Sequence, residues 1–172
     1  MSLTLKDCLN PWKAADGNIR VSGQLPVAGL DRLAGALLEI NSDVDVNLEF
    51  KRTEEKLPIL EGSLSGLLTL ECQRCLEPMD LQVQSKFSMA FIRPGTTLDS
   101  EIYDLYEVED EQICLTNVIE DELLLLLPQV PMHSDPVCVI ETEFGDGIIE
   151  DTAEEKENPF AVLASLKDKL NN

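Results

Sequence analysis

Apolar and polar residues alternate in three separate stretches within the first hundred residues. The first stretch covers residues 43–50, where every even position is apolar and every odd position is acidic or an amide. The second covers residues 60–70, with Gly62 and Gly66 on its apolar side, and the third covers residues 81–92. Alternation with a period of two predicts β-strands that have one buried and one solvent-facing side. Because residues 71–80 join the second and third strands directly, we predict that these two strands are antiparallel neighbours.

Helical periodicity predicts two helices in the same part of the chain. The first covers residues 27–40 after Pro26, with apolar residues at spacings of three and four: Val27, Leu30, Ala34, Leu37 and Leu38. The second begins at about Asn117, which can act as the N-cap, and Glu120 completes a capping box. This helix is apolar on all sides over residues 123–127, which predicts that its end is buried, and Pro128 ends it.

Charge is distributed unevenly along the chain. Residues 1–100 contain fourteen acidic and ten basic residues, and residues 101–172 contain nineteen acidic and three basic ones, so −4 and −16 make up the net charge of −20. Residues 141–157 contain too little apolar surface to offset chain entropy, and we expect a disordered acidic linker there. We therefore predict one α+β domain over residues 1–140, built on an antiparallel β-sheet with packed helices, followed by a flexible acidic C-terminal tail that ends in a short helix.

The end of the tail, residues 158–172, has the pattern of a short amphipathic helix. Asn158 can cap it, Pro159 suits its first position, and two lysines lie near its C-terminus. Its apolar residues form one stripe: Phe160, Leu163, Leu166 and Leu170. This stripe is either a docking face for a protein partner or a cover for an apolar patch on the same domain.

Composition and motifs argue against several functional classes. The N-terminus has no apolar stretch of signal-peptide length and no run could span a bilayer, so we expect a cytoplasmic protein without a membrane association. There is no phosphate-binding loop or dinucleotide motif, and the single histidine has no recognisable partner for a hydrolytic triad. We identify no catalytic residue and no small-molecule substrate. The excess of acidic residues predicts weak binding to bare rRNA and favours a basic protein partner.

The five cysteines provide the strongest chemical motif. Cys72 and Cys75 form a CxxC pair between two predicted strands, and His133 and Cys138 are the other donors at similar spacing. A zinc ion takes four tetrahedral Cys and His ligands, so these four residues are a candidate zinc site; the alternatives are reduced thiols in a hairpin turn or a redox pair. Outside a secretory context we expect reduced thiols or a metal site rather than a disulfide framework, with Cys8 and Cys114 as ordinary, partly buried residues.

Three blocks of sequence closely resemble the YceD family of large ribosomal RNA subunit accumulation proteins. They are LTLECQRCLEPM at residues 68–79, VIEDELLLLLPQVPMH at 118–133 and NPFAVLASLK at 158–167. Some relatives have a richer cysteine cluster in the region that matches His133 and Cys138.

The resemblance implies a non-enzymatic factor in ribosome biogenesis that supports the synthesis, processing or stability of 23S rRNA. It also implies basic ribosomal proteins or assembly factors as partners. The alternative is a zinc-binding or RNA-processing protein that acts directly on rRNA. The family supplies no established catalytic residue that can be transferred to this chain.

Overall fold

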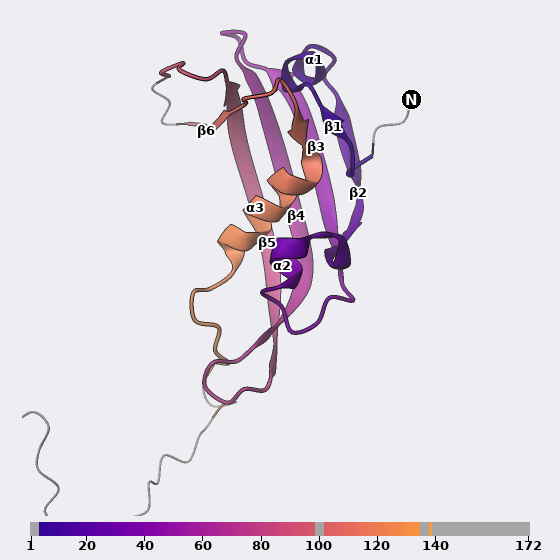
Figure 1. Cartoon of the computed structure of the whole chain (residues 1–172), viewed down its shortest axis with the longest axis vertical. Helices are drawn as coiled ribbons and strands as arrows, with labels where there is room; N and C mark the ends of the chain where they lie inside the picture. Colours follow the sequence, from indigo (N-terminus) through magenta and orange to yellow (C-terminus); the bar gives the residue numbers. More distant parts are fainter. Residues whose placement is uncertain (1–3, 99–101, 135–137, 139–172) are drawn as a thin grey trace, which may run out of the picture. The chain divides into compact units, whose positions relative to one another are not determined.

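A five-stranded β-sheet forms the centre of the domain (Figure 1). The computed structural model describes residues 4–98, 102–134 and 138. Four antiparallel strands follow one another across the sheet: β2 (Arg20–Pro26), β3 (Asp43–Arg52), β4 (Pro58–Glu71) and β5 (Pro78–Ile92). The short strand β6 (Asp104–Glu107) pairs in parallel with the end of β5. The predicted α+β class is confirmed, as are the three alternating strands and the antiparallel pairing of β4 with β5.

The remaining elements lie against one face of this sheet. A two-stranded ribbon pairs β1 (Cys8–Leu9) with β7 (Ile113–Cys114), and two short helices, α1 (Pro11–Asp16) and α2 (Asp31–Ala34), precede the long helix α3 (Leu115–Leu126). Figure 1 shows α2 and α3 in front of the strands. Among the residues that the structure describes, no helix is long and apolar enough to cross a membrane.

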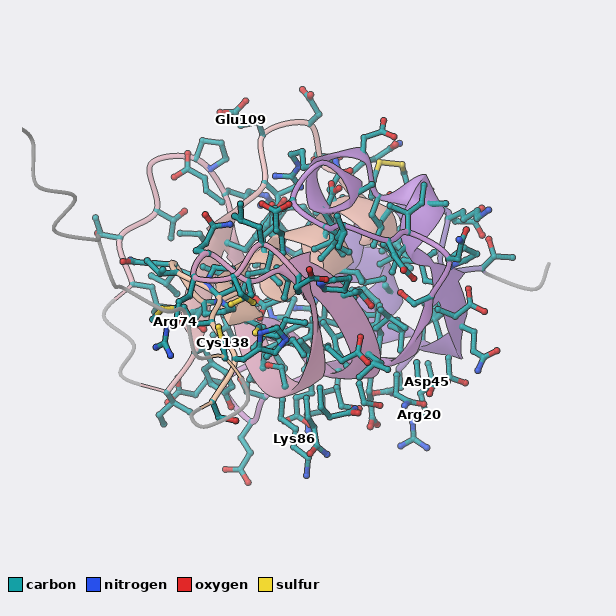
Figure 2. All side chains as sticks on the ribbon, turned by 90° about the horizontal axis from the view of Figure 1, so that it is seen from below. Arg20, Asp45, Arg74, Lys86, Glu109 and Cys138 are labelled. Atoms are coloured by element: carbon teal, nitrogen blue, oxygen red, sulfur yellow. A yellow bond between two sulfur atoms is a disulfide. The ribbon has the colours of Figure 1, made fainter. Side chains whose placement is uncertain are left out.

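The apolar sides of the predicted strands form the core beneath α3. Phe50, Leu60 and Leu64 are fully buried, and Val118, Ile119 and Leu123 of α3 belong to the same cluster. Gly62 is required on this face, because a Cβ there would collide with the ring of its cross-strand partner Phe87. The opposite face is polar: Figure 2 shows Arg20, Asp45 and Lys86 extending from it in the same direction. Burying one face of an antiparallel sheet accounts for the period-two pattern of the sequence.

The prediction of one helix over residues 27–40 is wrong. A 3₁₀ turn, η1 (Val27–Gly29), is followed by only one turn of α-helix in α2. Pairing with neighbouring strands holds the segment at both ends, since the Val27 N–H donates to Ser42 O and the Leu38 N–H donates to Thr69 O. These tertiary hydrogen bonds override the local helical pattern. Val27, Leu30 and Leu33 are nevertheless buried, as their spacing indicated, whereas Leu38 is exposed.

The predicted N-terminus of the second helix is also wrong. Helix α3 begins at Leu115, its N-cap residue is Cys114, and no side chain caps it. The Glu120 carboxylate is buried in the second turn and accepts hydrogen bonds from the Arg32 N–H at 2.7 Å and the Leu33 N–H at 3.1 Å. The Arg32 guanidinium completes the contact at 2.9 Å. Glu120 therefore joins α3 to the start of α2 rather than capping its own helix.

The expectation for Cys8 and Cys114 needs a correction as well. The two cysteines are opposite each other in the β1–β7 ribbon and form a disulfide. Since 106 residues separate them, the sequence pattern did not indicate that the two strands pair. The predicted linker at 141–157 and the predicted helix at 158–172 lie outside the described residues.

We predict that Glu120→Gln lowers the free energy of unfolding by about 1–3 kcal/mol at neutral pH, because charged hydrogen bonds to two N–H groups and a guanidinium are weakened. Burial alone would raise the pKa of Glu120, but the N–H donors of Leu33 and Arg32 and the Arg32 guanidinium lower it below its ordinary value. The ionised carboxylate stabilises the folded state above the unfolded pKa of about 4.3, and this contribution is lost as the pH falls through the lower folded pKa.

Urea unfolding of both proteins between pH 3 and pH 7 tests this prediction. The difference in the free energy of unfolding between wild type and Glu120→Gln should disappear toward pH 3. The matched control is Asp121→Asn, whose side chain is 46% exposed in its pair with Arg32 and which should cost less than about 1 kcal/mol. An equal loss in both variants would contradict the special role of Glu120.

Candidate metal centre

The end of the β4–β5 hairpin presents the CxxC pair. The Cys72 N–H donates to Glu77 O at 3.0 Å, which closes the connection as a continuation of the β-ladder. Within it, the Leu76 N–H donates to Cys72 O at 2.8 Å, and Leu76 takes a left-handed backbone conformation with φ of 63°. This tight turn places Cys72 inside the protein and Cys75 at an intermediate depth. The CxxC spacing thus lets one turn present two thiols toward one point.

The chain after α3 returns to this turn and supplies the other two donors. The Gln73 N–H donates to Pro131 O at 2.8 Å, and the Arg74 guanidinium donates to Cys138 O at 3.1 Å. Arg74 and Cys138 accordingly lie close together in Figure 2. These contacts hold His133 and Cys138 beside residues that are about sixty positions earlier in the chain.

All four predicted donors meet in one cluster. Their ligand atoms lie within 4.8 Å of one another: Cys72 Sγ, Cys75 Sγ, His133 Nδ1 and Cys138 Sγ. Cys72 Sγ is 3.8 Å from Cys138 Sγ, and Cys75 Sγ is 3.4 Å from His133 Nδ1. A tetrahedral zinc ion with bonds of about 2.3 Å to sulfur and about 2.0 Å to nitrogen has edges of roughly 3.5–3.8 Å. The spacing of the donors therefore fits a Cys3His zinc site.

A hydrogen bond orients the histidine for metal binding. His133 Nε2 lies 3.0 Å from the carbonyl oxygen of Pro78. That oxygen can only accept, so Nε2 carries the proton and Nδ1 is left with its lone pair. A backbone carbonyl bound to the far nitrogen of a metal-binding histidine is a common arrangement that fixes the ring. Nδ1 is also the nitrogen that faces the thiols.

Backbone N–H groups surround Cys72 and favour its thiolate form. Burial raises its pKa, but hydrogen bonds from the N–H groups of Cys75, His133 and Arg74 outweigh that effect and lower the pKa to about 5. The His133 N–H lies 3.4 Å from Cys72 Sγ. By contrast, burial and the two neighbouring cysteines together raise the pKa of Cys138 to about 11. The negative charge already present at Cys72 opposes a second thiolate nearby, so a cation is needed for both thiols to ionise together.

A small apolar cluster shields the centre from water. Leu70, Cys72, Met79 and Cys138 are buried together, with Leu37, Leu81 and Leu127 packed around them. Cys72 and Cys138 are therefore buried in a second cluster, which adjoins the core beneath α3 through these three leucines, while Cys75 and His133 are partly buried. The sequence pattern identified all four donors, but it missed the Pro78 carbonyl and the role of Arg74. A backbone acceptor has no sequence signal, and an arginine between two cysteines is too common to indicate a role.

Two comparisons with known proteins identify the class of this chain. Residues 60–167 match the family model described as large ribosomal RNA subunit accumulation protein YceD. The chain is also 35% identical, over 165 residues, to a protein of that name from Haemophilus influenzae, covering 94% of this chain and 95% of the relative. No solved structure matches.

A match of this extent means that the chain belongs to the YceD family. The resemblance found in its three sequence blocks is confirmed.

We predict that the purified protein contains about one zinc ion per chain, because three thiols and one imidazole fill a tetrahedral coordination shell. The variants Cys72→Ser and His133→Ala should each lose most of this zinc, as measured by elemental mass spectrometry of the purified proteins. Cys114→Ser is the matched control, since Cys114 lies in a disulfide outside the cluster, and it should keep its zinc. Loss of zinc from the control, or its retention in both cluster variants, would contradict the assignment.

Proposed function

We propose that this protein is a non-enzymatic factor of ribosome biogenesis that supports the accumulation of 23S rRNA through protein partners. The observation that carries the proposal is the match to a relative named for large ribosomal RNA subunit accumulation, which extends over almost the whole chain. The proposed place of action is the cytoplasm, where bacterial ribosomes are assembled.

The metal centre supports a structural role rather than catalysis. Catalytic zinc sites have three protein ligands and keep the fourth position for water or substrate, whereas structural sites have four. Here four protein donors converge, and two of them are fully buried thiols. We infer that a bound zinc ion clamps the β4–β5 hairpin to the chain that follows α3 and leaves no position for a reacting water.

The charge of the protein supports a protein partner over bare RNA. A net charge of −20 repels phosphates, and phosphate neutralisation by Lys and Arg supplies most of the affinity of RNA-binding proteins. Four basic residues form ion pairs among the described residues. Arg32 pairs with Glu120 and Asp121, and the other three pairs are Arg20 with Glu49, Lys51 with Glu61 and Arg52 with Asp16. Basic ribosomal proteins or assembly factors are the complementary partners.

We further propose that the stripe of Phe160, Leu163, Leu166 and Leu170 is a docking helix for such a partner. Its spacing matches the recognition mode in which an amphipathic helix lies in an apolar groove. The acidic residues before it would direct the segment toward basic surfaces.

We predict that a bacterial strain lacking its YceD-family gene recovers its ratio of 23S to 16S rRNA when the full-length chain is expressed. A chain without residues 158–172 should fail to restore the ratio, although its melting temperature stays within a few degrees of the full-length value. Quantitative RNA sequencing and thermal unfolding of the purified proteins check the two parts.

The control is a full-length chain in which residues 158–172 keep their composition but the four apolar residues are exchanged with polar ones of the same segment. It should fail like the deletion. If the deletion instead lowers stability strongly and rRNA falls only as far as the protein is lost, the helix covers its own domain and the docking proposal is wrong.

A further inference from the structure

One edge of the central sheet is open over most of its length. Strand β5 has fifteen residues, but β6 pairs only with residues 89–92. Over residues 79–88 the opposite side of β5 pairs with β4, and no strand among the described residues pairs with the outer side. Figure 1 shows β6 only at the upper part of this edge. An edge of this kind is a ready template for a further strand.

The direction of the free backbone groups follows from three hydrogen bonds. Glu77 O accepts from the N–H of Cys72, so the backbone N–H and C=O groups of odd-numbered residues in β5 point toward β4. Ile92 O accepts from the N–H of Val108, and Pro78 O faces His133. The backbone groups of even-numbered residues therefore point away from β4, toward the open edge. The register between β4 and β5 runs without a bulge, which keeps this alternation along the strand.

Apart from Ser88, which directly precedes the pairing with β6 at Met89, the outward groups of the open stretch therefore belong to four residues: Asp80, Gln82, Gln84 and Lys86. Within the part of the chain that the structure describes, their backbone N–H and C=O groups have no hydrogen-bond partner. On the covered face, Leu81 and Phe87 of this stretch are only partly buried, whereas Val83 between them is buried. An added strand would pair the backbone groups and cover these two side chains.

The upper end of the open edge has a strongly acidic corner. A hollow there is lined by residues 85–88 of β5, by Asp104 at the start of β6 and Ile102 just before it, and by Glu122 of α3. It continues across β4, β3 and β2, where its charged residues are Glu61, Glu49 and Arg20. Burial raises the pKa of Glu122, and the carboxylates of Asp104 and Asp121 raise it further. Lys86 is the cation of β5 at this hollow, and Figure 2 shows it extending from the polar face of the sheet. Asp121 is paired with Arg32, whereas neither Asp104 nor Glu122 forms a salt bridge within the described part of the chain.

We propose that an extended, basic segment of a partner protein adds to the open edge of β5 as a further strand, with a Lys or Arg side chain between Asp104 and Glu122. Backbone hydrogen bonds to residues 80–86 would supply affinity, and the acidic corner would select a basic sequence. The inference deepens the proposed function, because it rests on that function for a basic protein as the partner.

Charge complementarity decides between this occupant and two others. A second copy of the chain would bring another molecule with a net charge of −20 against the same corner. The residues that follow Cys138 in the sequence include Glu141 and Glu143, whose charge has the same sign as that of the corner. A basic strand is the occupant that removes the repulsion between Asp104 and Glu122.

The test uses the full chain and a synthetic nine-residue peptide of alternating lysine and valine. Binding should be measured by calorimetry at physiological salt, and hydrogen exchange should be followed by NMR. The backbone amides of Gln82, Gln84 and Lys86 should exchange rapidly in the free protein and become protected when the peptide binds. The amides of Leu81 and Val83 already bond to β4 and should change little. A peptide of alternating lysine and proline has the same charge, but it loses the N–H donors at every proline and is a poor β-strand, so it should bind at least about tenfold more weakly.

Two variants separate the contribution of backbone pairing at the edge from the contribution of the acidic corner. Gln84→Pro removes an outward N–H without touching the β4 ladder, and Gln84→Thr keeps that N–H as the matched control. The paired change Asp104→Asn with Glu122→Gln removes the acidic corner and should weaken the lysine–valine peptide about tenfold or more. This second variant keeps the test decisive if Gln84→Pro does not fold.

Several results would overturn the proposal. They are no peptide binding, equal binding of both peptides, protection of amides elsewhere, or wild-type affinity in Gln84→Pro and the paired variant. Concentration-dependent dimers that Gln84→Pro abolishes, without peptide binding, would assign the edge to a second copy. Peptide binding that appears only after residues 139–172 are removed would assign the open edge to that segment of the same chain. The assay uses purified components, so its failure leaves the rRNA measurement in cells untouched.

Discussion

The buried carboxylate of Glu120 determines where α3 lies, and much of the domain depends on that position. Three donors from the start of α2 converge on this one group, so the charge is stabilised in a place where an unpaired carboxylate would be very costly. Once α3 is fixed across the sheet, its apolar side completes the core over β3, β4 and β5. The direction in which the chain leaves α3 then brings His133 back to the end of the β4–β5 hairpin.

A metal ion held by the four-donor cluster would close a long loop at the other end of the domain. Three thiols and an imidazole share a small volume there, and the negative charge favoured at Cys72 contributes to the raised pKa of Cys138. A divalent cation removes this repulsion and joins segments that are far apart in sequence. The closure also places residue 138 beside the first residues of β5, at the lower end of the open sheet edge. The site proposed for the metal thus lies next to the start of β5, and the site proposed for the basic strand lies along its middle.

Local pattern predicted those parts of the structure in which one element faces both core and solvent. The alternation at Val44, Val46 and Leu48 predicted β3 because the sheet has one covered face, and the spacing of Cys72 and Cys75 predicted two donors at one turn. Features that depend on distant pairing could not be predicted in this way. Residues 27–40 had a helical pattern but are held by strand contacts at both ends, Cys8 meets Cys114 only through a two-residue ribbon, and Glu120 serves a neighbouring helix rather than its own. Strand β2 was missed because only two of its seven residues, Val21 and Leu25, are buried, which is too few to give an alternating pattern. Strand β6 was missed because it is short and acidic.

The central claim of this account is that Cys72, Cys75, His133 and Cys138 bind one zinc ion as a closed, four-ligand site. X-ray absorption spectroscopy of the purified full-length protein at the zinc edge measures the ligand shell directly. The account predicts three sulfur atoms at about 2.3 Å and one nitrogen at about 2.0 Å, with no coordinated water. A shell of nitrogen and oxygen atoms, or one with fewer than three sulfur atoms, would contradict it.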